Sequence, residues 1–458
     1  DIPFDLIEEV GRSVVIAVGE KRSTWRRANL YAETSRQILG WRFASASDRE
    51  AITGLIVEAA EHGSLRLTPP DLTTTPASFT RVDGSSEFRP KHSTVFSAEH
   101  LLAAEDRLLK RADAITAPTV DIEVVDTITN QPVKGHRLSP EQAQAIAKVA
   151  VSGRQLDLLV GPAGAGKTTA LRVLKKAWTQ QHGGNSVAGL APSAAAAAVL
   201  AEELGIGTEN TAKWLYEHQQ GHVRFSRGQL VIIDEATLAG TLTLDRITAH
   251  AEQAGAKVLL VGDWAQLQSV EAGGAFGMLV EARDDAPELV DIHRFTNKWE
   301  KLASIDLRHG RVDVVDTYID HGRVDGGTGE SMTEAAYVAW KHDVDHGRAS
   351  ILIADNAATV RDLNVRAQAE RGGAHGRAVT LIDGTNATTG DWIITRQNDR
   401  RLRTLATAGS ATATAGQSMK YAPTARSSSA ARTAAAEQSS SRPRTSPSTS
   451  TSATPSPS

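Results

Sequence analysis

A glycine-rich segment, Gly161–Thr169, carries the clearest sign of chemistry in the sequence, and its residues are GPAGAGKTT. It satisfies the phosphate-loop pattern G-x-x-x-x-G-K-[ST] and lies between an apolar run, Leu156–Val160, and a predicted helix, Thr168–Trp178. A chance glycine-rich turn would not bring the lysine, the threonine and both flanking elements together. In such a loop backbone amides surround a phosphate, Lys167 reaches the β- and γ-phosphates, and the Thr168 hydroxyl binds Mg²⁺. The predicted ATP-binding residues are Gly161, Pro162, Ala163, Gly164, Ala165, Gly166, Lys167, Thr168 and Thr169.

Two adjacent carboxylates follow another apolar run. Asp234 and Glu235 come directly after LVII in the segment LVIIDEA. Parallel sheets bind their ligands at the carboxyl ends of the strands. We therefore predict that Asp234 holds Mg²⁺ through water and that Glu235 activates the attacking water as a general base. An acidic cap on a following helix is the alternative, and the presence of the phosphate loop disfavours it.

Two glutamines extend the predicted site. Gln266 lies three residues after Asp263, at the end of the run VLLVG, where a polar side chain can sense the γ-phosphate. A simple turn after the strand is the alternative there. Gln142 lies in the segment LSPEQ, where Ser139 is a good helix N-cap and Pro140 suits the first helical position. A helix start alone accounts for this segment on physical grounds, and pairing of the Gln142 amide with adenine is the functional alternative.

The elements that position these residues are predicted to be strands alternating with helices. The runs LDLLV, SVAGLA, LVIIDEA and KVLLVGD indicate buried strands of a parallel α/β sheet. A strand SILIAD near Ala349 begins a second series, followed by a helix at 356–370 and a strand-rich piece at 379–399.

The segment before the sheet is predicted to be mainly helical. Apolar residues recur at helical spacing over 25–39, 48–62 and 98–112. Ser47 is expected to cap the second of these helices, with Glu50 completing a capping box. A connector with a VDIEVVD strand follows the third helix.

Composition excludes several classes of protein. The chain has no cysteine, which excludes disulfides, a thiol nucleophile and Cys-based metal sites. No apolar run approaches the ~20 residues of a membrane span. The net charge is −4, and because the tail 405–458 carries +4, residues 1–404 carry −8. Nucleic acid would therefore have to bind in a local groove and not by overall charge.

The tail at 405–458 consists mostly of Ala, Ser, Thr and Pro. Such a segment cannot bury enough apolar surface to offset its ordering entropy, so we predict that it is disordered. An evolved linker and a shifted reading frame both account for its composition.

Taken in order, the motifs resemble a known helicase family. LSPEQ, GPAGAGKTT, APSAAAA, VIIDEAT, VGDWAQLQSV and DIHRF look like the first half of a superfamily 1 helicase of the RecD-like type. The similarity is greatest to the helicase portion of actinobacterial MobF-class (TraA/TrwC-like) conjugative relaxases. The stretches KRSTWRR, GWRF and FRPKHSTVF also resemble those proteins. The resemblance covers residues ~10–403.

The resemblance implies roles for single residues. Gln142 would correspond to the adenine-reading glutamine and Gln266 to the γ-phosphate sensor. Arg294 would contact the γ-phosphate as an arginine finger, whereas without the resemblance a surface salt bridge would be preferred. Pro192-Ser193 and Thr211–Trp214 would line a single-stranded DNA track, with Trp214 either stacking on a base or lying in the core. The resemblance further implies a cytoplasmic, ATP- and Mg²⁺-dependent enzyme that acts on single-stranded DNA, with other conjugation proteins as further partners.

The sequence departs from the family pattern in two places. The fourteen histidines are scattered, and the spaced pair His218 and His222 is interpreted as a polar helix end, so we expect the metal-dependent nicking domain to be missing. After Arg403 we find neither the DNA-gripping motif nor the second arginine finger of the second lobe. We therefore expect a fragment of a relaxase–helicase. A nucleotide-binding remnant without helicase activity, and a P-loop ATPase of another DNA-processing pathway, are the alternatives.

The predicted fold is an α/β RecA-like P-loop NTPase lobe with flanking parts. The predicted domains are a mainly helical one at 1–117, a connector at 118–135, the first RecA-like lobe at 136–300, a helical connection at 301–348, a partial second lobe at 349–404 and the disordered tail at 405–458.

Overall fold

The computed structural model describes residues 2–69, 73–82, 84, 86–132, 137–266, 272–370, 379–381, 384–388, 392–393 and 453–454. The chain forms two compact units, one made of residues 1–192 and 196–301 and the other of residues 193–195 and 302–458. None of the helices in these described ranges is long and apolar enough to cross a membrane.

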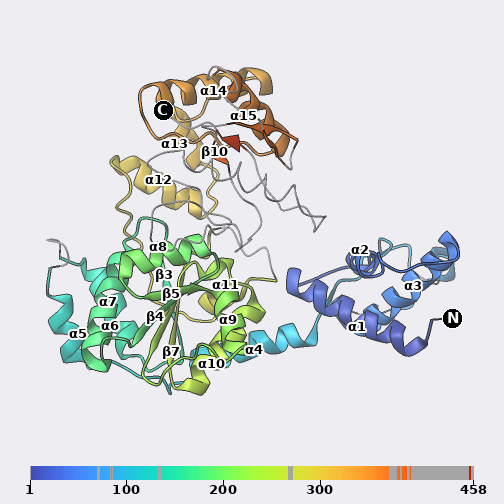
Figure 1. The fold of residues 1–458 in the computed structure, drawn as a ribbon, viewed down its shortest axis with the longest axis horizontal. Helices are drawn as coiled ribbons and strands as arrows, with labels where there is room; N and C mark the ends of the chain where they lie inside the picture. The colour runs from blue at the N-terminus through green and yellow to red at the C-terminus, as the bar shows by residue number, and fades with distance from the viewer. Residues whose placement is uncertain are drawn as a thin grey trace. The chain divides into compact units, whose positions relative to one another are not determined.

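A five-stranded parallel sheet forms the centre of the first unit (Figure 1). The strand order is β3-β7-β6-β4-β5, so β7 lies between the strand before the phosphate loop and the strand before the two carboxylates. The backbone at 287–289 extends the sheet beyond β3, because the Val160 N–H donates to Pro287 O and the Leu289 N–H donates to Val160 O. The strands are β3 (Leu156–Val160), β4 (Val187–Ala191), β5 (Gly207–Asn210), β6 (Leu230–Ile233) and β7 (Lys257–Gly262).

Helices cover both faces of this sheet, which explains why β3, β4, β6 and β7 are mostly apolar runs without alternation, whereas the edge strand β5 is polar. Along β3, Leu159 joins one hydrophobic core, whereas Leu158 and Val160 join the other. The first core is closed by α5 (Ile122–Thr129), α6 (Pro140–Val151), α7 (Lys167–His182) and α8 (Ala194–Leu204). The second is closed by α4 (Glu99–Asp113), α9 (Thr211–Gln219), α10 (Thr241–Ala254) and α11 (Ala275–Glu281), with the short 3₁₀ turn η2 (Ala236–Leu238). The predicted RecA-like α/β lobe is confirmed.

The N-terminal residues form a helical cluster, as predicted. Trp25 lies at its centre, 2% exposed, with its indole N–H donating to Ser64 Oγ at 3.1 Å. Its elements are α1 (Phe4–Lys21), α2 (Arg27–Gln37), α3 (Ala46–His62), the antiparallel pair β1 (Leu65–Arg66) and β2 (Phe96–Ser97), and the 3₁₀ turn η1 (Ala77–Phe79).

Helix α4 leads from this cluster to the sheet. Its Arg107 and Arg111 both donate to the Asp245 carboxylate of α10, each at 2.7 Å for the shortest contact. Arg111 is almost buried, so this pair is shielded from water and from salt more than a surface ion pair is.

Two local predictions for this unit were wrong. The segment VDIEVVD is the helix α5 and not a strand, because Val125 and Ile128, three residues apart, are both buried toward α6 and α7. Packing outweighs the weak strand preference of valine and isoleucine. The N-cap of α3 is Ser45 and not Ser47, since Ser45 Oγ accepts a hydrogen bond from the Asp48 N–H at 3.1 Å.

The second unit contains the remaining helices and short strand pairs. Arg366 joins α14 and α15, since it pairs with Glu334 and lies 3.8 Å above the Tyr337 ring. The elements are α12 (Lys298–Arg308), whose residues 298–301 belong to the first unit, α13 (Val314–Asp320), α14 (Gly329–Asp345), α15 (Ala357–Glu370), β8 (Val379–Thr380) paired with β9 (Asn386–Ala387), and β10 (Trp392–Ile393) paired with β11 (Ala453–Thr454).

The predicted strand SILIAD does not form. Ile351 and Ile353 are 75% and 85% exposed, and no described strand pairs with this segment to take up its backbone hydrogen bonds. The predicted helix at 356–370 is confirmed as α15. The predicted disordered tail lies outside the described residues except for β11, a strand that the prediction of disorder did not include.

Candidate functional site

The phosphate loop joins β3 to α7 and requires glycine at two positions. Gly164 and Gly166 have φ values of 90° and 82°, in the left-handed region that favours glycine. A Cβ on Gly164 would lie 2.8 Å from Arg294 Cβ, and one on Gly166 would lie 2.2 Å from Gln142 Nε2. The loop is therefore enclosed by Gln142 and Arg294, two residues far apart in the sequence.

Lys167 is the first residue of α7, and its side chain turns back over the loop. The ammonium donates to Gly161 O at 2.6 Å and to Pro162 O at 3.0 Å. The N-terminal end of α7, which is its positive end, and this ammonium thus both lie at the phosphate loop. That arrangement suits a phosphate group, as the sequence predicts.

Thr168 follows on the same helix turn and has a partner that the sequence did not predict. Its hydroxyl donates to Glu203 Oε2 on α8 at 2.9 Å. The missed residue lies near the end of α8, beyond the motif APSAAAA at the start of that helix, so no motif spacing in the sequence could have identified it.

Asp234 and Glu235 lie at the carboxyl end of β6, two strands from the loop. The Asp234 N–H donates to Leu190 O of β4 at 3.0 Å, which continues the sheet by one residue. Burial raises the pKa of Asp234, although the Glu235 N–H at 2.9 Å and the charge of Lys167 act against that rise. Lys167 is therefore close enough to these carboxylates to affect their ionisation.

Glu235 has an unusual backbone for a residue with a side chain. Its φ is 52°, which is uncommon outside glycine and costs energy that neighbouring structure must supply. The side chain remains open to solvent. Packing around the carboxyl raises the pKa of Glu235, and the neighbouring charge of Asp234 raises it further. A carboxylate with a raised pKa, open to solvent at a ligand-binding edge, is suited to accept a proton from water.

Gln266 follows β7, the strand between β3 and β6. Its backbone N–H donates to Asp263 O at 3.0 Å, and its Nε2 donates to Asp263 Oδ2 at 3.3 Å. The end of β7 also touches the phosphate loop, since the Gly161 N–H donates to Gly262 O at 3.0 Å. Gln266 thus belongs to a turn that begins next to the loop, while residues 267–271 lie outside the described residues.

The Gln142 side chain makes the helix-start contacts that the sequence predicts and also contacts the phosphate loop. Ser139 Oγ accepts from the Gln142 N–H at 3.1 Å and Gln142 Oε1 accepts from the Ser139 N–H at 3.2 Å, a reciprocal capping box at the start of α6. The same side chain places Nε2 3.5 Å from Ala165 O in the phosphate loop. The helix start therefore also brings Gln142 to the loop, a contact that the favoured physical interpretation missed.

Arg294 is brought to the loop by the backbone beside it. The His293 N–H donates to Gly164 O at 2.9 Å, which puts the following residue against the glycine. Upstream, the Glu141 carboxylate of α6 accepts from the Val290 N–H at 2.5 Å. The segment DIHRF is thus held between α6 and the phosphate loop.

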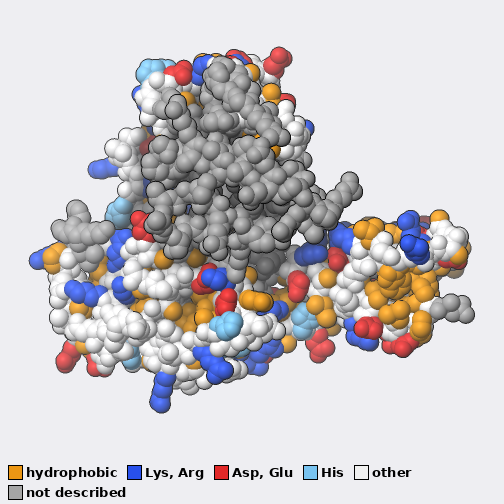
Figure 2. All heavy atoms as spheres, viewed as in Figure 1, with side chains coloured by type: hydrophobic (Ala, Val, Ile, Leu, Met, Phe, Trp, Pro, Cys, Tyr) orange, Lys and Arg blue, Asp and Glu red, His pale blue; other side chains and the backbone are white. Residues whose placement is uncertain are grey.

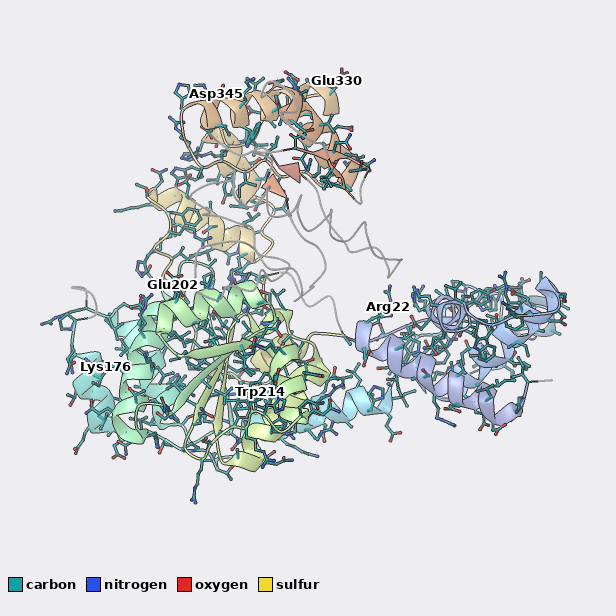
Figure 3. All side chains as sticks on the ribbon, viewed as in Figure 1. Arg22, Lys176, Glu202, Trp214, Glu330 and Asp345 are labelled. Atoms are coloured by element: carbon teal, nitrogen blue, oxygen red, sulfur yellow. The ribbon has the colours of Figure 1, made fainter. Side chains whose placement is uncertain are left out.

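Trp214 does not serve as an open stacking platform. It is 7% exposed, and its ring stacks on Phe225 with centroids 4.0 Å apart and on His218 at 4.9 Å. Of the two interpretations of this residue, the core tryptophan is correct (Figure 3 labels it). His218 Nδ1 donates to Val223 O and His222 pairs with Glu217, as expected of a polar helix end. Within the described ranges, no three His, Asp or Glu side chains form a group that could hold a metal ion.

Comparison with known proteins finds a family match that spans these residues. A family model described as an AAA domain matches residues 137–329. The conjugal transfer protein TraA of Rhizobium radiobacter is 34% identical over 276 residues, which are 58% of this chain and 24% of that protein. The RecBCD enzyme subunit RecD of Mycobacterium tuberculosis is 40% identical over 91 residues, which are 19% of this chain and 16% of that protein.

A solved structure, the Pif1 helicase from Candida albicans, aligns with a TM-score of 0.37 and 17% identity over 57% of this chain and 65% of that chain. The chain spans about a quarter of the length of the TraA protein that it matches. The sequence matches show a P-loop helicase-like module, homologous to part of TraA and of RecD.

Proposed function

We propose that this chain is the ATP-hydrolysing motor module of a DNA helicase of the conjugative relaxase type. One observation carries the proposal: the phosphate loop with Lys167 and Thr168 follows β3, the carboxylates Asp234 and Glu235 follow β6 at the same edge of one parallel sheet, with only β7 between the two strands, and the two groups interact electrostatically. The relatives named TraA support a role in conjugal transfer, and the relative named RecD supports a helicase.

The residues at this edge fit Mg²⁺ and a nucleoside triphosphate. Glycine at 164 and 166 lets Arg294 and Gln142 approach the loop where a Cβ would collide with them, and Lys167 supplies a positive charge. Thr168 and Asp234 supply the oxygen ligands that Mg²⁺ prefers. When bound there, Mg²⁺ offsets the charge that develops on the phosphates.

The chemistry of the protein groups follows from their positions. Lys167 holds the β- and γ-phosphates in place, and Arg294, against Gly164, offsets negative charge from the other side of the loop. Glu235 takes a proton from the attacking water, the water oxygen bonds to the γ-phosphorus, and the bond to the bridging oxygen breaks, which leaves ADP and phosphate. Gln266 senses whether the γ-phosphate is present, and Gln142 contacts the adenine.

Single-stranded DNA is the proposed partner, and other conjugation proteins are proposed as further ones. Acidic and basic side chains are both spread over the visible face of the lobe (Figure 2), so DNA would bind in a local groove and not on one basic face. Because the ATP that drives such a motor is a cytoplasmic substrate, we place the protein in the cytoplasm.

Phosphate release by the purified chain, measured with and without single-stranded DNA, tests the proposal. We expect turnover that requires both Mg²⁺ and Lys167. ATP binding with no turnover would favour the alternative of a nucleotide-binding remnant. No binding of ATP at all would contradict both.

A further inference from the structure

A third carboxylate, that of Glu203, lies next to the phosphate-loop residue Thr168. Glu203 is in the last turn of α8, and its Oε2 accepts the hydrogen bond from Thr168 Oγ1 at 2.9 Å. Thr168 is the residue whose hydroxyl would bind Mg²⁺. The carboxylate is thus next to the metal position without being part of the phosphate-loop motif.

The end of α8 is fixed in this place by α7 itself. Arg172 Nε donates to Glu203 O at 2.8 Å, and Lys175 Nζ donates to Leu204 O at 2.7 Å. Both cations are on the helix that begins at the phosphate loop, and cations suit the negative end of a helix. Because the Glu203 backbone is tied to the helix that carries Thr168, the two side chains keep their relative positions.

The hydroxyl of Thr168 has one proton to donate and two lone pairs to offer. A metal ion takes a lone pair, so the proton must go to another acceptor. An ionised carboxylate is only an acceptor. Glu203 therefore accepts the hydrogen bond from the Thr168 hydroxyl, which leaves a lone pair of the hydroxyl oxygen for the metal. Its negative charge has a second effect, since it attracts a cation and repels a phosphate that has no cation.

We propose that Glu203 is a positioning residue that orients Thr168 toward Mg²⁺ and makes nucleotide binding depend on Mg²⁺. This inference rests on the proposed function of the loop. It predicts different effects under two conditions: Glu203 strengthens the binding of the Mg²⁺-nucleotide, and it weakens or leaves unchanged the binding of the nucleotide without metal.

The test is the affinity of the full chain for ADP, measured once with Mg²⁺ and once with EDTA. Glu203→Ala removes both the acceptor and the charge, and Glu203→Gln keeps an acceptor oxygen but removes the charge. Glu202→Gln is the matched control, because Glu202 is the exposed neighbour at the same end of α8 (labelled in Figure 3). Circular dichroism of each variant checks that it is folded.

We expect Glu203→Ala to lower the ratio of the Mg²⁺ affinity to the EDTA affinity about tenfold or more, with Glu203→Gln between it and the wild type and Glu202→Gln equal to the wild type. An unchanged ratio in Glu203→Ala would overturn the inference. Equal weakening with and without Mg²⁺ is one form of that result, and it would show a merely structural role. If the wild-type chain bound ADP under neither condition, the proposed function itself would fail.

Discussion

At the scale of single residues, Lys167 has the most direct role in nucleotide binding. Its ammonium donates hydrogen bonds to the carbonyl oxygens of Gly161 and Pro162, in the loop that would bind the phosphates. Substitution of this residue therefore removes a charge without disturbing the buried side of α7.

We expect Lys167→Ala to weaken ATP binding at least tenfold, about 1.4 kcal/mol. Calorimetry measures it directly. Lys176→Ala is the control, since Lys176 is exposed on the same helix and donates to Gln131 (labelled in Figure 3). Equal affinity for the wild type and Lys167→Ala would contradict the phosphate-loop assignment.

Glu235 gives the site a pH dependence of known sign. Its surroundings hold its pKa above the ordinary 4.5 of a glutamate, so the basic form is gained only as the pH rises through that raised value. We expect the ATP turnover of the wild type to rise with pH over this range and then level off, as measured by phosphate release at saturating ATP. The rising limb at or below pH 4.5 would contradict the role of Glu235 as the base.

Because of the same raised pKa values, the stability of the fold falls as the pH rises, whereas the turnover that Glu235 supports increases. The folded chain binds protons at Asp234 and Glu235 more tightly than the unfolded chain does. Their contribution to stability is therefore lost as the pH rises from the ordinary carboxyl pKa through the raised one. The site gains its base over the same pH range in which it loses this stability.

At the scale of elements, a buried ionic cluster joins β3 and β7 away from the phosphate loop. Asp157 of β3 accepts from Arg283 at 2.8 Å and lies 3.2 Å from Lys257 Nζ of β7, which is fully buried. Burial alone would raise the pKa of Asp157, but the two cations and the Ser152 hydroxyl outweigh it and hold this pKa below its usual range. The strand before the phosphate loop, β3, and its neighbour β7 are thus joined by charge as well as by their ladder.

We expect Asp157→Asn to lower the free energy of unfolding by about 3–5 kcal/mol, because it leaves buried cations without their counter-charge. Denaturation by urea measures the change. Asp285→Asn is the control: its carboxylate also pairs with Arg283 but is 57% exposed, so we expect a loss of under about 1 kcal/mol. Equal losses of stability in the two variants would show that burial does not determine how much each ion pair of this cluster contributes to the free energy of unfolding.

The sequence predicted those elements whose burial is complete. The strands before the phosphate loop and before Asp234 are apolar at nearly every position, and both formed where expected. VDIEVVD and SILIAD are as rich in branched residues, yet one is a helix and the other pairs with no described strand, since a packing partner decides the outcome. Glu203 could not be predicted, because its contact with Thr168 depends on how α8 crosses α7.

At the scale of the whole molecule, the question is whether ATP can drive movement on DNA. Translocation needs two lobes that close on ATP and open on its release. The sequence after Arg403 predicts that the DNA-gripping motif and the second arginine finger of the second lobe are missing. ATP would then gain little differential binding energy from closure, and a ligand shifts a conformational equilibrium only by that difference.

We therefore expect this 458-residue chain to bind ATP, to hydrolyse it slowly with little stimulation by DNA, and not to separate a tailed duplex. A strand-separation assay with fluorescently labelled DNA measures the last of these. Processive unwinding by the purified chain would show that residues of the tail supply the missing functions.

The central claim is that the edge of the sheet formed by the phosphate loop and by Asp234 and Glu235 hydrolyses ATP. The most direct test is a single-turnover measurement on the wild type and on Glu235→Gln, with bound and hydrolysed ATP determined in the same samples. We expect Glu235→Gln to bind ATP like the wild type and to hydrolyse it about 10²-fold or more slowly, the range for loss of a general base. Hydrolysis at the wild-type rate by Glu235→Gln, or a loss of ATP binding in that variant, would contradict the account.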